Sequence, residues 1–357
     1  MSSTSGMLSG MRDLTVAIVG ATGAVGQEML LALEERAFPV ATVKALASAR
    51  SAGAQLPYNG PGSIDGSVTI EELTHDSFAS VDIALFSAGG GISKEFAPSA
   101  VAAGAVVIDN SSAFRMDEDV PLIVPEVNAA DALAHRGIIA NPNCSTIPLV
   151  VALNAMRTVA PLKRVVVSTY QAASGAGQAA MDELYHQTAD FLADRPLHPK
   201  EFAHRIAFNC IPHIDVFLDD GSTKEEWKMV VETQKILHEP GLTVNATCVR
   251  VPVLRCHAES VNVEFSAPFE LSAIRAALES APGIVMMDDP SEKLYPMPAF
   301  LTGTDDTFIG RLRIDTSAPH ALSFWNVSDQ LRKGAAVNAV QIAEVLVHAD
   351  SAEGARS

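Results

Sequence analysis

Hydrophobic runs that alternate with glycine-rich or polar turns fill the amino-terminal part of the chain. The run LTVAIVG (residues 14–20) leads into the glycine-rich GATGAVG, and helical periodicity follows over residues 25–33. A second run, ATVKALAS, ends at Ser48, and a third, VDIALFSAGGG (81–91), precedes a helical segment at about 93–103. Strand, turn and helix repeated in this order predict an open parallel sheet with helices on its faces.

The pattern changes in the second half of the chain. A helix is predicted at about 147–159 and a strand at 164–170, and the later runs AFNCIPHI, VNATCVRVPV and SVNVEFSA are predicted as strands around a helical KEEWKMVVETQKIL. Because strands and helices no longer alternate, this half is predicted to hold a mixed or antiparallel sheet. Residues 286–315, rich in Pro, Gly and Asp, are expected to wrap the surface, and a last helix at 334–349 is expected to pack on the first domain.

The first turn carries a dinucleotide-binding pattern. Gly20, Gly23 and Gly26 have GxxGxxG spacing, a variant of the fingerprint that lets backbone approach a pyrophosphate. A plain strand-to-helix turn is the alternative, but its place first in a series of such units favours a nucleotide. Where proteins that prefer NAD carry Asp or Glu, this chain has Arg50 beside Ser51. Unless Arg50 is only a solvated loop residue, it suits a 2′-phosphate, so NADP is the predicted cofactor.

The stretch GIIANPNCSTI (residues 137–147) delivers a cysteine to a predicted helix start. A helix N-terminus offers unpaired N–H groups and a partial positive charge, which favour a thiolate over a thiol. Cys144 is therefore the candidate nucleophile, although a free cysteine beside an apolar helix is more often a small core residue. Its polar neighbours Asn143, Ser145 and Thr146 favour the nucleophile. Either Asn143 or Ser145 could cap the helix.

Three charged residues are candidates for ligand binding. Arg115 follows the apolar run AVVIDN, at the carboxyl end of a predicted strand, where open α/β sheets bind ligands. Glu225 and Lys228 lie three residues apart on a predicted helix and therefore share one face. A surface arginine and a solvent salt bridge are the plain alternatives.

Arg250 and His257 follow in a strand-like segment interrupted by Pro252. On one unbroken strand these two side chains would face opposite ways, so a joint role requires a bulge or a turn between them. Spacing alone does not favour His257 over His204 or His213.

Composition and charge narrow the classes of function. With 42 Asp and Glu against 25 Lys and Arg, the formal net charge of −17 argues against nucleic acid and acidic membranes as partners. An anionic ligand would need a few well-placed cations. The apolar runs are shorter than a membrane span and the polar start lacks signal-peptide features, so a cytoplasmic protein is expected. The four cysteines show no metal-ligand spacing, and no metal is predicted.

The chain resembles the aspartate-β-semialdehyde dehydrogenase family in motifs that occur in the same order: GATGAVG, SAGGGISKEFAP, VIDNSSAFR, ANPNCST, STYQAASGAG, EEWKM, TCVRVPV and YPMP. These motifs run from about residue 14 to the last predicted helix. The resemblance implies reversible, NADPH-dependent reductive dephosphorylation of L-aspartyl 4-phosphate to L-aspartate 4-semialdehyde through a cysteine thioester. It also implies a place in diaminopimelate, lysine, threonine and methionine biosynthesis.

The resemblance also implies catalytic and cofactor-binding roles. Cys144 would be the thioester nucleophile, assisted by Asn143, and His257 would be the acid/base. Gln171 would hold the thioester substrate. The implied cofactor-binding residues are Gly20, Thr22, Gly23, Ala24, Val25, Gly26, Arg50, Ser51, Ser174, Gly175 and Gln330.

Four residues are implied to bind the substrate. Glu225 would hold its amino group and Arg250 its carboxylate, while Arg115 and Lys228 would hold the phosphate. These residue types suit the task, because arginine pairs bidentately with carboxylates and a second arginine with a lysine suits phosphate.

Pattern and resemblance together give the expected architecture, which is of the α/β class. A Rossmann-type NADP-binding domain is expected at residues 12–143 plus about 326–350, and an α+β catalytic and dimerisation domain with a mixed sheet at 144–325. Residues 1–11 are expected to form a disordered tail. The expected partners are aspartyl phosphate, aspartate semialdehyde, phosphate and a second copy of the chain in a homodimer.

Some positions depart from the family pattern, and other functions can be weighed against it. Cys256 precedes His257 where many members have Gly, and Gln330 stands where others often have Asn. A reductase for N-acetylglutamyl phosphate, or one with glyceraldehyde 3-phosphate chemistry, would give Glu225 no cationic group to bind. A catalytically silent NADP-binding paralogue or a purely structural α/β protein would not need Cys144 and His257.

Overall fold

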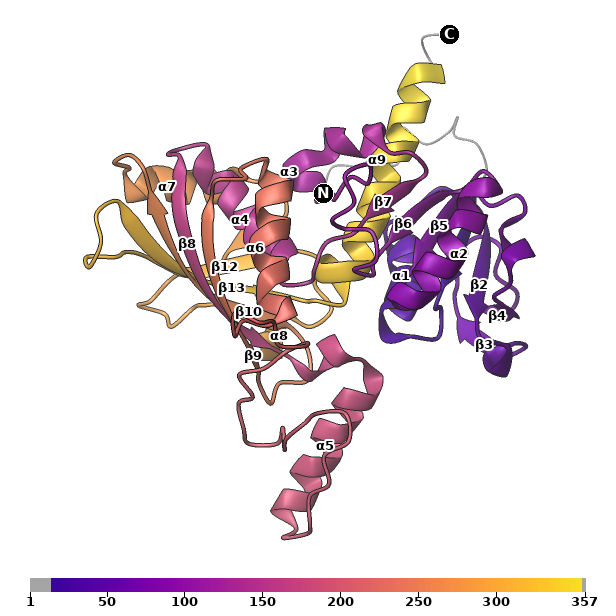
Figure 1. The fold of residues 1–357 in the computed structure, drawn as a ribbon, viewed down its shortest axis with the longest axis horizontal. Coiled ribbons are helices and arrows are strands. Elements are labelled where there is room, and N and C mark those ends of the chain that lie inside the picture. Colours follow the sequence, from indigo (N-terminus) through magenta and orange to yellow (C-terminus); the bar gives the residue numbers. More distant parts are fainter. Residues whose placement is uncertain (1–13, 355–357) are drawn as a thin grey trace. The chain divides into compact units, whose positions relative to one another are not determined.

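The computed structural model describes residues 14–354, with side chains to residue 349, and divides into two compact units (Figure 1). Unit 1 consists of the chain up to Asn141 together with the part after Ala335, and unit 2 is Pro142–Ala335. The sequence analysis expected the two boundaries at 143/144 and about 325/326. The tail predicted to be disordered lies outside the described residues.

A seven-stranded sheet forms the centre of unit 1. Its strands are β1 (Leu14–Val19), β2 (Val40–Ala47), β3 (Gln55–Pro57), β4 (Ser67–Glu72), β5 (Ile83–Phe86), β6 (Val106–Asp109) and β7 (Ile138–Ala140). They lie in the order β3-β4-β2-β1-β5-β6-β7, and all neighbours are parallel except β3 and β4. Because the order reverses beside β1, the carboxyl ends of β1, β2 and β5 meet where such sheets bind ligands.

Helices cover both faces of this sheet. The helices α1 (Ala24–Glu35) and α9 (Val337–Gly354) share one core with Val16 and Ile18 of β1, and α2 (Gly90–Ala102) shares the other with Ala17 and Val19. Alternate residues of a strand point to opposite faces, so β1 is buried on both sides. The shorter elements are the 3₁₀ turns η1 (Ala49–Ser51), η2 (His75–Phe78) and η3 (Ala129–Ala134) and the helix α3 (Pro125–Asn128).

Unit 2 is built on a six-stranded mixed sheet, as predicted. The strands are β8 (Leu162–Gln171), β9 (Thr243–Arg250), β10 (His257–Phe265), β11 (Ile284–Met286), β12 (Thr307–Ile314) and β13 (Ala321–Ser328). Their order is β11-β12-β13-β10-β8-β9; β8 with β9 and β11 with β12 are parallel, and the other pairs are antiparallel. The adjacent ends of β8, β9 and β10 carry Gln171, Arg250 and His257.

Helices lie over one face of this sheet, and one further helix extends from it. The helices of unit 2 are α4 (Thr146–Arg157), α5 (Gln178–Leu192), α6 (Lys224–Leu237), α7 (Leu271–Ser280) and α8 (Pro298–Leu301), with the turns η4 (Ala173–Ala176) and η5 (Arg332–Ala336). While α4, α6 and α7 pack together beside the strands, α5 and the loop after it form an arm, residues 178–223, that projects from the sheet (Figure 1). Crossing a membrane would need a longer and more apolar helix than any in the described residues.

Two predictions about elements were wrong. The run AFNCIPHI forms only an isolated bridge, at Ile211, because Phe208 has a positive φ and Pro212 has no N–H to donate. Residues 286–315, expected to wrap the surface, contain β12, in which Thr307, Phe308 and Ile309 are buried. Its apolar residues follow the Pro- and Asp-rich turns that dominated the composition of this segment.

Candidate active site

Cys144 lies in the turn just before α4, and its side chain is partly exposed. Asn143 Oδ1 accepts hydrogen bonds from the backbone N–H groups of Ser145 at 2.9 Å and Thr146 at 3.3 Å. Ser145 occupies the N-cap position, but its buried hydroxyl bonds no group of the described residues. Of the two caps that the sequence left open, Asn143 is therefore the one that acts, and it fixes the helix start beside the cysteine.

A carboxylate holds the amides around Cys144. Glu225 Oε1 accepts hydrogen bonds from Asn143 Nδ2 at 2.9 Å and Gln171 Nε2 at 3.2 Å, and Oε2 accepts one from Lys228 Nζ at 3.1 Å. Burial raises the pKa of Glu225, but the charge of Lys228 and these hydrogen bonds outweigh it and hold the pKa below its usual value. Glu225 is thus a buried, ionised anchor rather than half of a surface salt bridge.

A turn over residues 251–256 separates Arg250 from His257, as a joint role required. Both side chains bind Ala172, which directly follows β8. Arg250 Nη1 donates to Ala172 O at 2.6 Å, and Ala172 N donates to His257 Nδ1 at 3.0 Å. A Cβ atom on Gly175 would lie 2.8 Å from Arg250 Nη1 and 3.1 Å from His257 Nε2, so a larger residue here would displace the Arg250 side chain.

The charges of this group favour a neutral histidine, and Arg250 interacts with Cys144. Burial and the positive charge of Arg250 hold the pKa of His257 well below its usual value. Because Nδ1 accepts from Ala172, the neutral ring carries its proton on Nε2. Burial also lowers the pKa of Arg250, whereas negative charge on Cys144 and Glu225 opposes that shift. Arg250 and Cys144 are therefore close enough for their charges to stabilise each other.

Lys228 is engaged by two carboxylates. Its Nζ donates to Asp215 Oδ2 at 2.7 Å and to Glu225 Oε2 at 3.1 Å, and its side chain is only 12% exposed. Burial lowers the pKa of Lys228, but the charges and hydrogen bonds of Glu225 and Asp215 raise it above the usual value. Asp215 belongs to the arm, and sequence reasoning missed it because its spacing from α6 carries no signal.

Three further residues pack around Cys144 and His257. Gln330 Oε1 accepts from the backbone N–H of Cys256 at 2.8 Å, and its Nε2 hydrogen-bonds Ser174 Oγ. A Cβ on Gly334 would lie 3.0 Å from the carbonyl oxygen of Cys144 and 3.2 Å from its Cβ, so this glycine allows the π-helical turn η5 to approach the cysteine. Gly334 was not predicted as a site residue, although π-helical turns are frequent at functional sites.

Unit 1 contains its own cleft, of about 570 Å³, at the carboxyl ends of β1, β2 and β5. Gly20, with a φ of +87°, lies against Ser87 O, which a Cβ would approach to 2.7 Å. The first turn of α1 includes Ala24, Val25 and Gly26, and the N-cap Gly23 supplies no side chain to cap the helix. The lining includes the predicted Gly20, Thr22 and Gly23, and the unpredicted Ala47, Ser48, Leu73, Ser87, Ala88, Ile92, Glu95 and Phe96.

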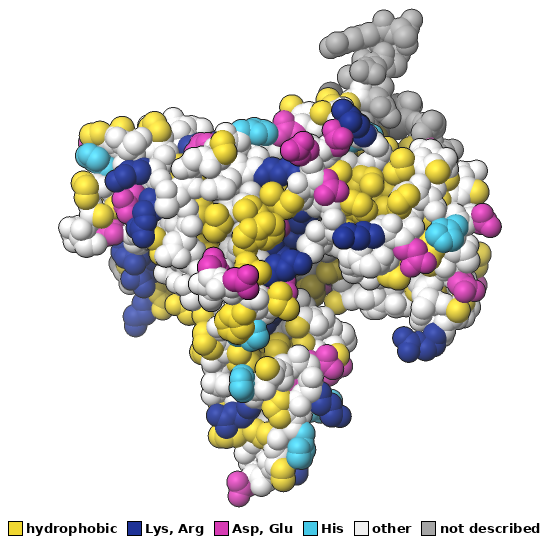
Figure 2. Space-filling model, viewed as in Figure 1, with side chains coloured by type: hydrophobic (Ala, Val, Ile, Leu, Met, Phe, Trp, Pro, Cys, Tyr) yellow, Lys and Arg dark blue, Asp and Glu magenta, His cyan; other side chains and the backbone are white. Residues whose placement is uncertain are grey.

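The basic residues predicted in unit 1 differ in exposure. Arg50 is exposed in η1, directly after the Ser48 that lines the cleft, and Ser51 is partly buried. Arg115 is buried beyond the end of β6, where its Nη2 donates to Asn110 O at 2.8 Å. On the face shown in Figure 2, Lys and Arg side chains lie singly or in small groups rather than in one field.

The structure separates His257 from the other candidate histidines. His204 is exposed on the arm, and His213 stacks on Phe217 with ring centroids 4.3 Å apart. Neither position resembles that of His257, which is buried between Gln171 and Ala172.

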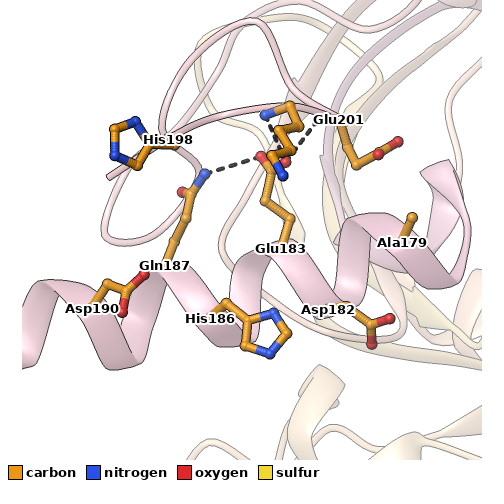
Figure 3. A pocket seen from close by; sticks show the side chains of 9 residues that line it. Ala179, Asp182, Glu183, His186, Gln187, Asp190, His198 and Glu201 are labelled. Carbon is orange, nitrogen blue, oxygen red and sulfur yellow. Dashed lines mark hydrogen bonds between the residues drawn. The ribbon is translucent and has the colours of Figure 1, made fainter. Parts of the chain in front are cut away.

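A second hollow, of about 360 Å³, lies on the arm, and its polar side chains take part in the structure of the arm (Figure 3). Glu183 accepts the backbone N–H groups of Lys200 at 2.8 Å and Glu201 at 2.6 Å, and Gln187 Nε2 donates to the same carboxylate at 3.0 Å. The polar side chains on its wall therefore hold the loop on α5. Within residues 14–354, three or more His, Cys, Asp or Glu side chains do not gather in a metal-binding arrangement.

Comparisons with known proteins agree with this architecture and these motifs. The family model described as semialdehyde dehydrogenase, NAD binding domain, matches residues 15–135, and the model described as semialdehyde dehydrogenase, dimerisation domain, matches residues 153–333. Aspartate-semialdehyde dehydrogenase of Bacillus subtilis is 51% identical over 94% of this chain and 98% of its own length, and that of Aquifex aeolicus is 52% identical over 93% and 97%.

A solved structure extends the likeness to three dimensions. Aspartate semialdehyde dehydrogenase II of Vibrio cholerae, described as complexed with ASA, superposes with a TM-score of 0.91 at 48% identity, covering 94% of this chain and 99% of the other. With half of the residues shared over nearly the full length of both chains, the chain belongs to the aspartate-semialdehyde dehydrogenase family.

Proposed function

We propose that this protein catalyses the reversible, NADPH-dependent reductive dephosphorylation of L-aspartyl 4-phosphate to L-aspartate 4-semialdehyde, in lysine, threonine and methionine biosynthesis. Membership of the family supports this reaction. The observation that carries it is the group around Cys144, a partly exposed thiol whose charge interacts with Arg250. Gly175 lies tightly between Arg250 and His257, so these two side chains lie close to each other.

The chemistry begins with the thiolate of Cys144. It attacks the acyl carbon of aspartyl phosphate, the S–C bond forms, and the C–O bond to phosphate breaks, which leaves a thioester. The N–H groups of Ser145 and Thr146 are engaged by Asn143 Oδ1, so the partial positive charge at the start of α4, rather than these N–H groups, would stabilise the oxyanion of the tetrahedral intermediate. A bound nicotinamide cofactor would supply the hydride that reduces the thioester to a thiohemiacetal oxyanion. The C–S bond then breaks, which releases the aldehyde and returns Cys144 to its thiolate.

His257 is the proposed acid/base. In its neutral form the ring presents Nε2–H as a donor to the acyl oxygen, because Nδ1 is occupied by Ala172 N–H. Burial and the charge of Arg250 keep the pKa of His257 low, so the ring readily releases any proton that it has taken up. Gln171 and Asn143 both donate to Glu225 Oε1 and would help to orient the thioester.

Each charged residue would bind a different group of the substrate. Arg250 suits the carboxylate, which it can bind bidentately, and Glu225 suits the ammonium group. Lys228 and Arg115 would bind the phosphate. Since Lys228 now binds Asp215 and Glu225, phosphate binding requires the ammonium group of Lys228 to exchange a carboxylate for phosphate.

The cleft of unit 1 fits a dinucleotide. Its volume of about 570 Å³, the uncapped start of α1 and the glycines that leave no room for Cβ atoms suit a pyrophosphate on a helix N-terminus. Arg50 and Ser51 suit the 2′-phosphate that distinguishes NADP from NAD. The residues proposed to hold the cofactor are Gly20, Thr22, Gly23, Ala24, Val25, Gly26, Arg50, Ser51, Ser174, Gly175 and Gln330.

The test is an assay in the oxidative direction. We expect NADPH formation from aspartate semialdehyde only when phosphate is present, and slower reaction with NAD. Cys144→Ala should abolish turnover while NADP binding, followed by fluorescence titration, and the thermal unfolding midpoint stay close to wild type. Turnover by Cys144→Ala, or turnover that does not depend on phosphate, would exclude this function.

A homodimer through unit 2 is the proposed assembly. The helices α4, α6 and α7 share one side of the sheet, which leaves the face with Tyr170, Ser260 and Trp325 open. Tyr170 is 40% exposed, and its ring lies 5.2 Å from that of Trp325. Exposed aromatic rings of this kind are typical of interface centres. The family model over residues 153–333 is itself described as a dimerisation domain, which supports a second copy of the chain as the occupant.

A further inference from the structure

Glu259 is a fully buried carboxyl group in the middle of unit 2, two residues beyond His257 on β10. It is 1% exposed, and its cross-strand neighbours are Thr169 on β8 and Asn326 on β13. Burial raises the pKa of Glu259 to about 8, against a smaller opposing effect of its hydrogen bond from Asn326. A buried carboxyl group without a cationic partner is more stable when it is neutral.

The hydrogen bonds of this pair are incomplete as long as the carboxyl group is ionised. Asn326 Nδ2 donates to Glu259 Oε2 at 3.0 Å. The two remaining oxygens, Glu259 Oε1 and Asn326 Oδ1, are buried and have no hydrogen-bond partner among the described residues. Two acceptors cannot satisfy each other, and each unsatisfied buried acceptor is costly. A proton on Oε1 turns it into a donor, and Asn326 Oδ1 is the acceptor on the same amide.

We propose that Glu259 is a neutral acid that forms a two-hydrogen-bond ring with the Asn326 amide, and that this ring positions His257. In this ring, Asn326 Nδ2–H donates to Oε2 while the Oε1–H group donates to Asn326 Oδ1. Both buried oxygens are then satisfied without a further partner. The relevance to His257 catalysis rests on the proposed function, whereas the protonation state of Glu259 does not.

The ring joins the two strands whose ends lead into the site. His257 pairs with Ser328, and Glu259 pairs with Asn326, so the ring lies two pairs in from the end of the β10–β13 ladder. On the other side of β10, Thr169 Oγ1 donates to Gln171 Oε1 at 3.0 Å, and Gln171 in turn binds Glu225. Glu259 lies two residues beyond His257 on β10 and opposite Thr169 on β8. It would act on the reaction only through the positions of His257 and Gln171, which makes it a positioning residue.

The groups around Glu259 offer no positive charge to stabilise an ionised form. Across from it, β8 carries Thr169, β13 carries Asn326 and Ser328, and β12 carries Thr307, whose buried hydroxyl also has no described partner. His257 on β10 is held neutral. On β9, Cys248 interacts with Glu259, and burial together with the charges of Glu225 and Glu226 of α6 raises the pKa of its thiol.

The sign of the pH effect follows from the proton balance. Below about 4.3, the ordinary pKa of glutamate, folded and unfolded chains both hold the proton. Between there and about 8 only the folded chain keeps it, so rising pH favours unfolding. Above about 8 the ring loses its proton, Oε1 becomes an acceptor again, and the support beneath His257 is weakened. Stability should fall up to about pH 8, and activity should fall above it.

Glu259→Gln separates this proposal from a plain packing role. Glutamine has the same shape, stays neutral, and can form the same ring through Nε2–H and Oε1. We expect its thermal midpoint to equal that of wild type near pH 5 and to exceed it by several degrees at pH 8.5, with kcat at pH 7 within about twofold and the alkaline loss of kcat absent. The matched control, Glu279→Gln on exposed α7, should follow the wild-type pH profile.

Two variants at the partner position complete the test. Asn326→Asp alone places two acids face to face, so it should lower kcat by about tenfold or more with little change in KM, and the double variant Glu259→Gln with Asn326→Asp inverts the ring and should restore kcat.

A spectroscopic test reports on the proton directly: the infrared band of a protonated carboxyl group at pH 7 should be present in the wild-type protein and should disappear in Glu259→Gln. Absence of that band in wild type, an unchanged pH dependence of the midpoint in Glu259→Gln, or no rescue by the double variant would overturn the proposal. The band and the midpoint do not depend on activity, so they also separate its failure from failure of the proposed function.

Discussion

At the scale of single residues, the site is a set of charges that hold one another in place. Glu225 remains ionised although it is buried, because Lys228, Asn143 and Gln171 all donate to it. Arg250 opposes protonation of His257 and interacts with the charge of Cys144. The residue types were recognisable in the sequence, but these contacts join positions such as 143 and 225 that are far apart in the chain. Only folding brings them together.

Asp215 gives the first prediction at this scale. In the proposed function its carboxylate would compete with phosphate for Lys228, since it accepts the Lys228 ammonium at 2.7 Å. Asp215→Asn removes that competing charge, so we expect KM for phosphate in the oxidative direction to fall by a few-fold, consistent with about 1 kcal/mol for a partly exposed pair. The control is Asp220→Asn on the same arm, which does not contact Lys228 in the described structure. A KM for phosphate that rises in Asp215→Asn would contradict this account.

Cys256 shows how a departure from the family pattern is accommodated. Its φ is +73°, a left-handed conformation that glycine adopts without strain and other residues adopt at a cost of roughly 1 kcal/mol. The buried thiol contacts Thr302 Oγ1 at 3.7 Å, and the backbone N–H is held by Gln330 at 2.8 Å. The turn that aims His257 therefore keeps the backbone shape that glycine would allow, and Gln330 helps to fix it.

At the scale of elements, helix starts and strand ends carry the chemistry. The predicted helix at about 147–159 appears as α4, Thr146–Arg157, which is apolar and buried on nearly all sides, and Pro148 is tolerated because it lies in the first turn. The strand predicted at 207–214 does not form, because an apolar run also needs backbone N–H donors and an extended backbone to pair in a sheet. Strand β12 was overlooked because Pro- and Asp-rich turns surround it. The hydrophobic pattern alone therefore does not distinguish a strand from an apolar loop, and it does not reveal a strand that lies among turns.

The cap of α4 gives a prediction at this scale. Asn143→Ala removes the acceptor for two N–H groups and a donor to Glu225, so we expect the free energy of unfolding to fall by about 1–2 kcal/mol in urea titration, together with a loss of activity. Ser145→Ala at the N-cap position removes a hydroxyl without a described partner and should cost less than about 0.5 kcal/mol. A larger loss in Ser145→Ala than in Asn143→Ala would show that Ser145 is the cap.

At the scale of the whole molecule, each of the two sheets carries a different feature at its strand ends. Unit 1 has a ligand cleft at the switch point of its parallel sheet, and unit 2 gathers its polar side chains at the adjacent ends of β8, β9 and β10. The chain enters unit 2 at Pro142, two residues before the nucleophile, and leaves it at Ala335, next to Gly334. The entry into unit 2 is therefore close to Cys144 in the chain, and the exit follows Gly334, which packs against Cys144 in space.

The proposed dimer is tested at the open face of the unit 2 sheet. Ser260→Arg places a long cation on this face opposite Trp325 and Ser168, and we expect it to convert a dimer into a monomer in light scattering. Ser280→Arg on the exposed end of α7 is the same substitution away from the face and should leave the dimer intact. A wild-type monomer, or a Ser260→Arg variant that remains dimeric, would exclude this face as the interface.

The sequence by itself determined the class of fold, the order of most elements and the residue types of the site, because periodicity and turn chemistry are local and the motifs occur in one fixed order. It also indicated that a turn must separate Arg250 from His257. The tertiary structure decided which groups satisfy one another: that Asn143 caps α4, that Asp215 engages Lys228, and that Glu259 faces Asn326. Burial, and with it the protonation state of a buried acid, depends on strands that meet only in the folded chain.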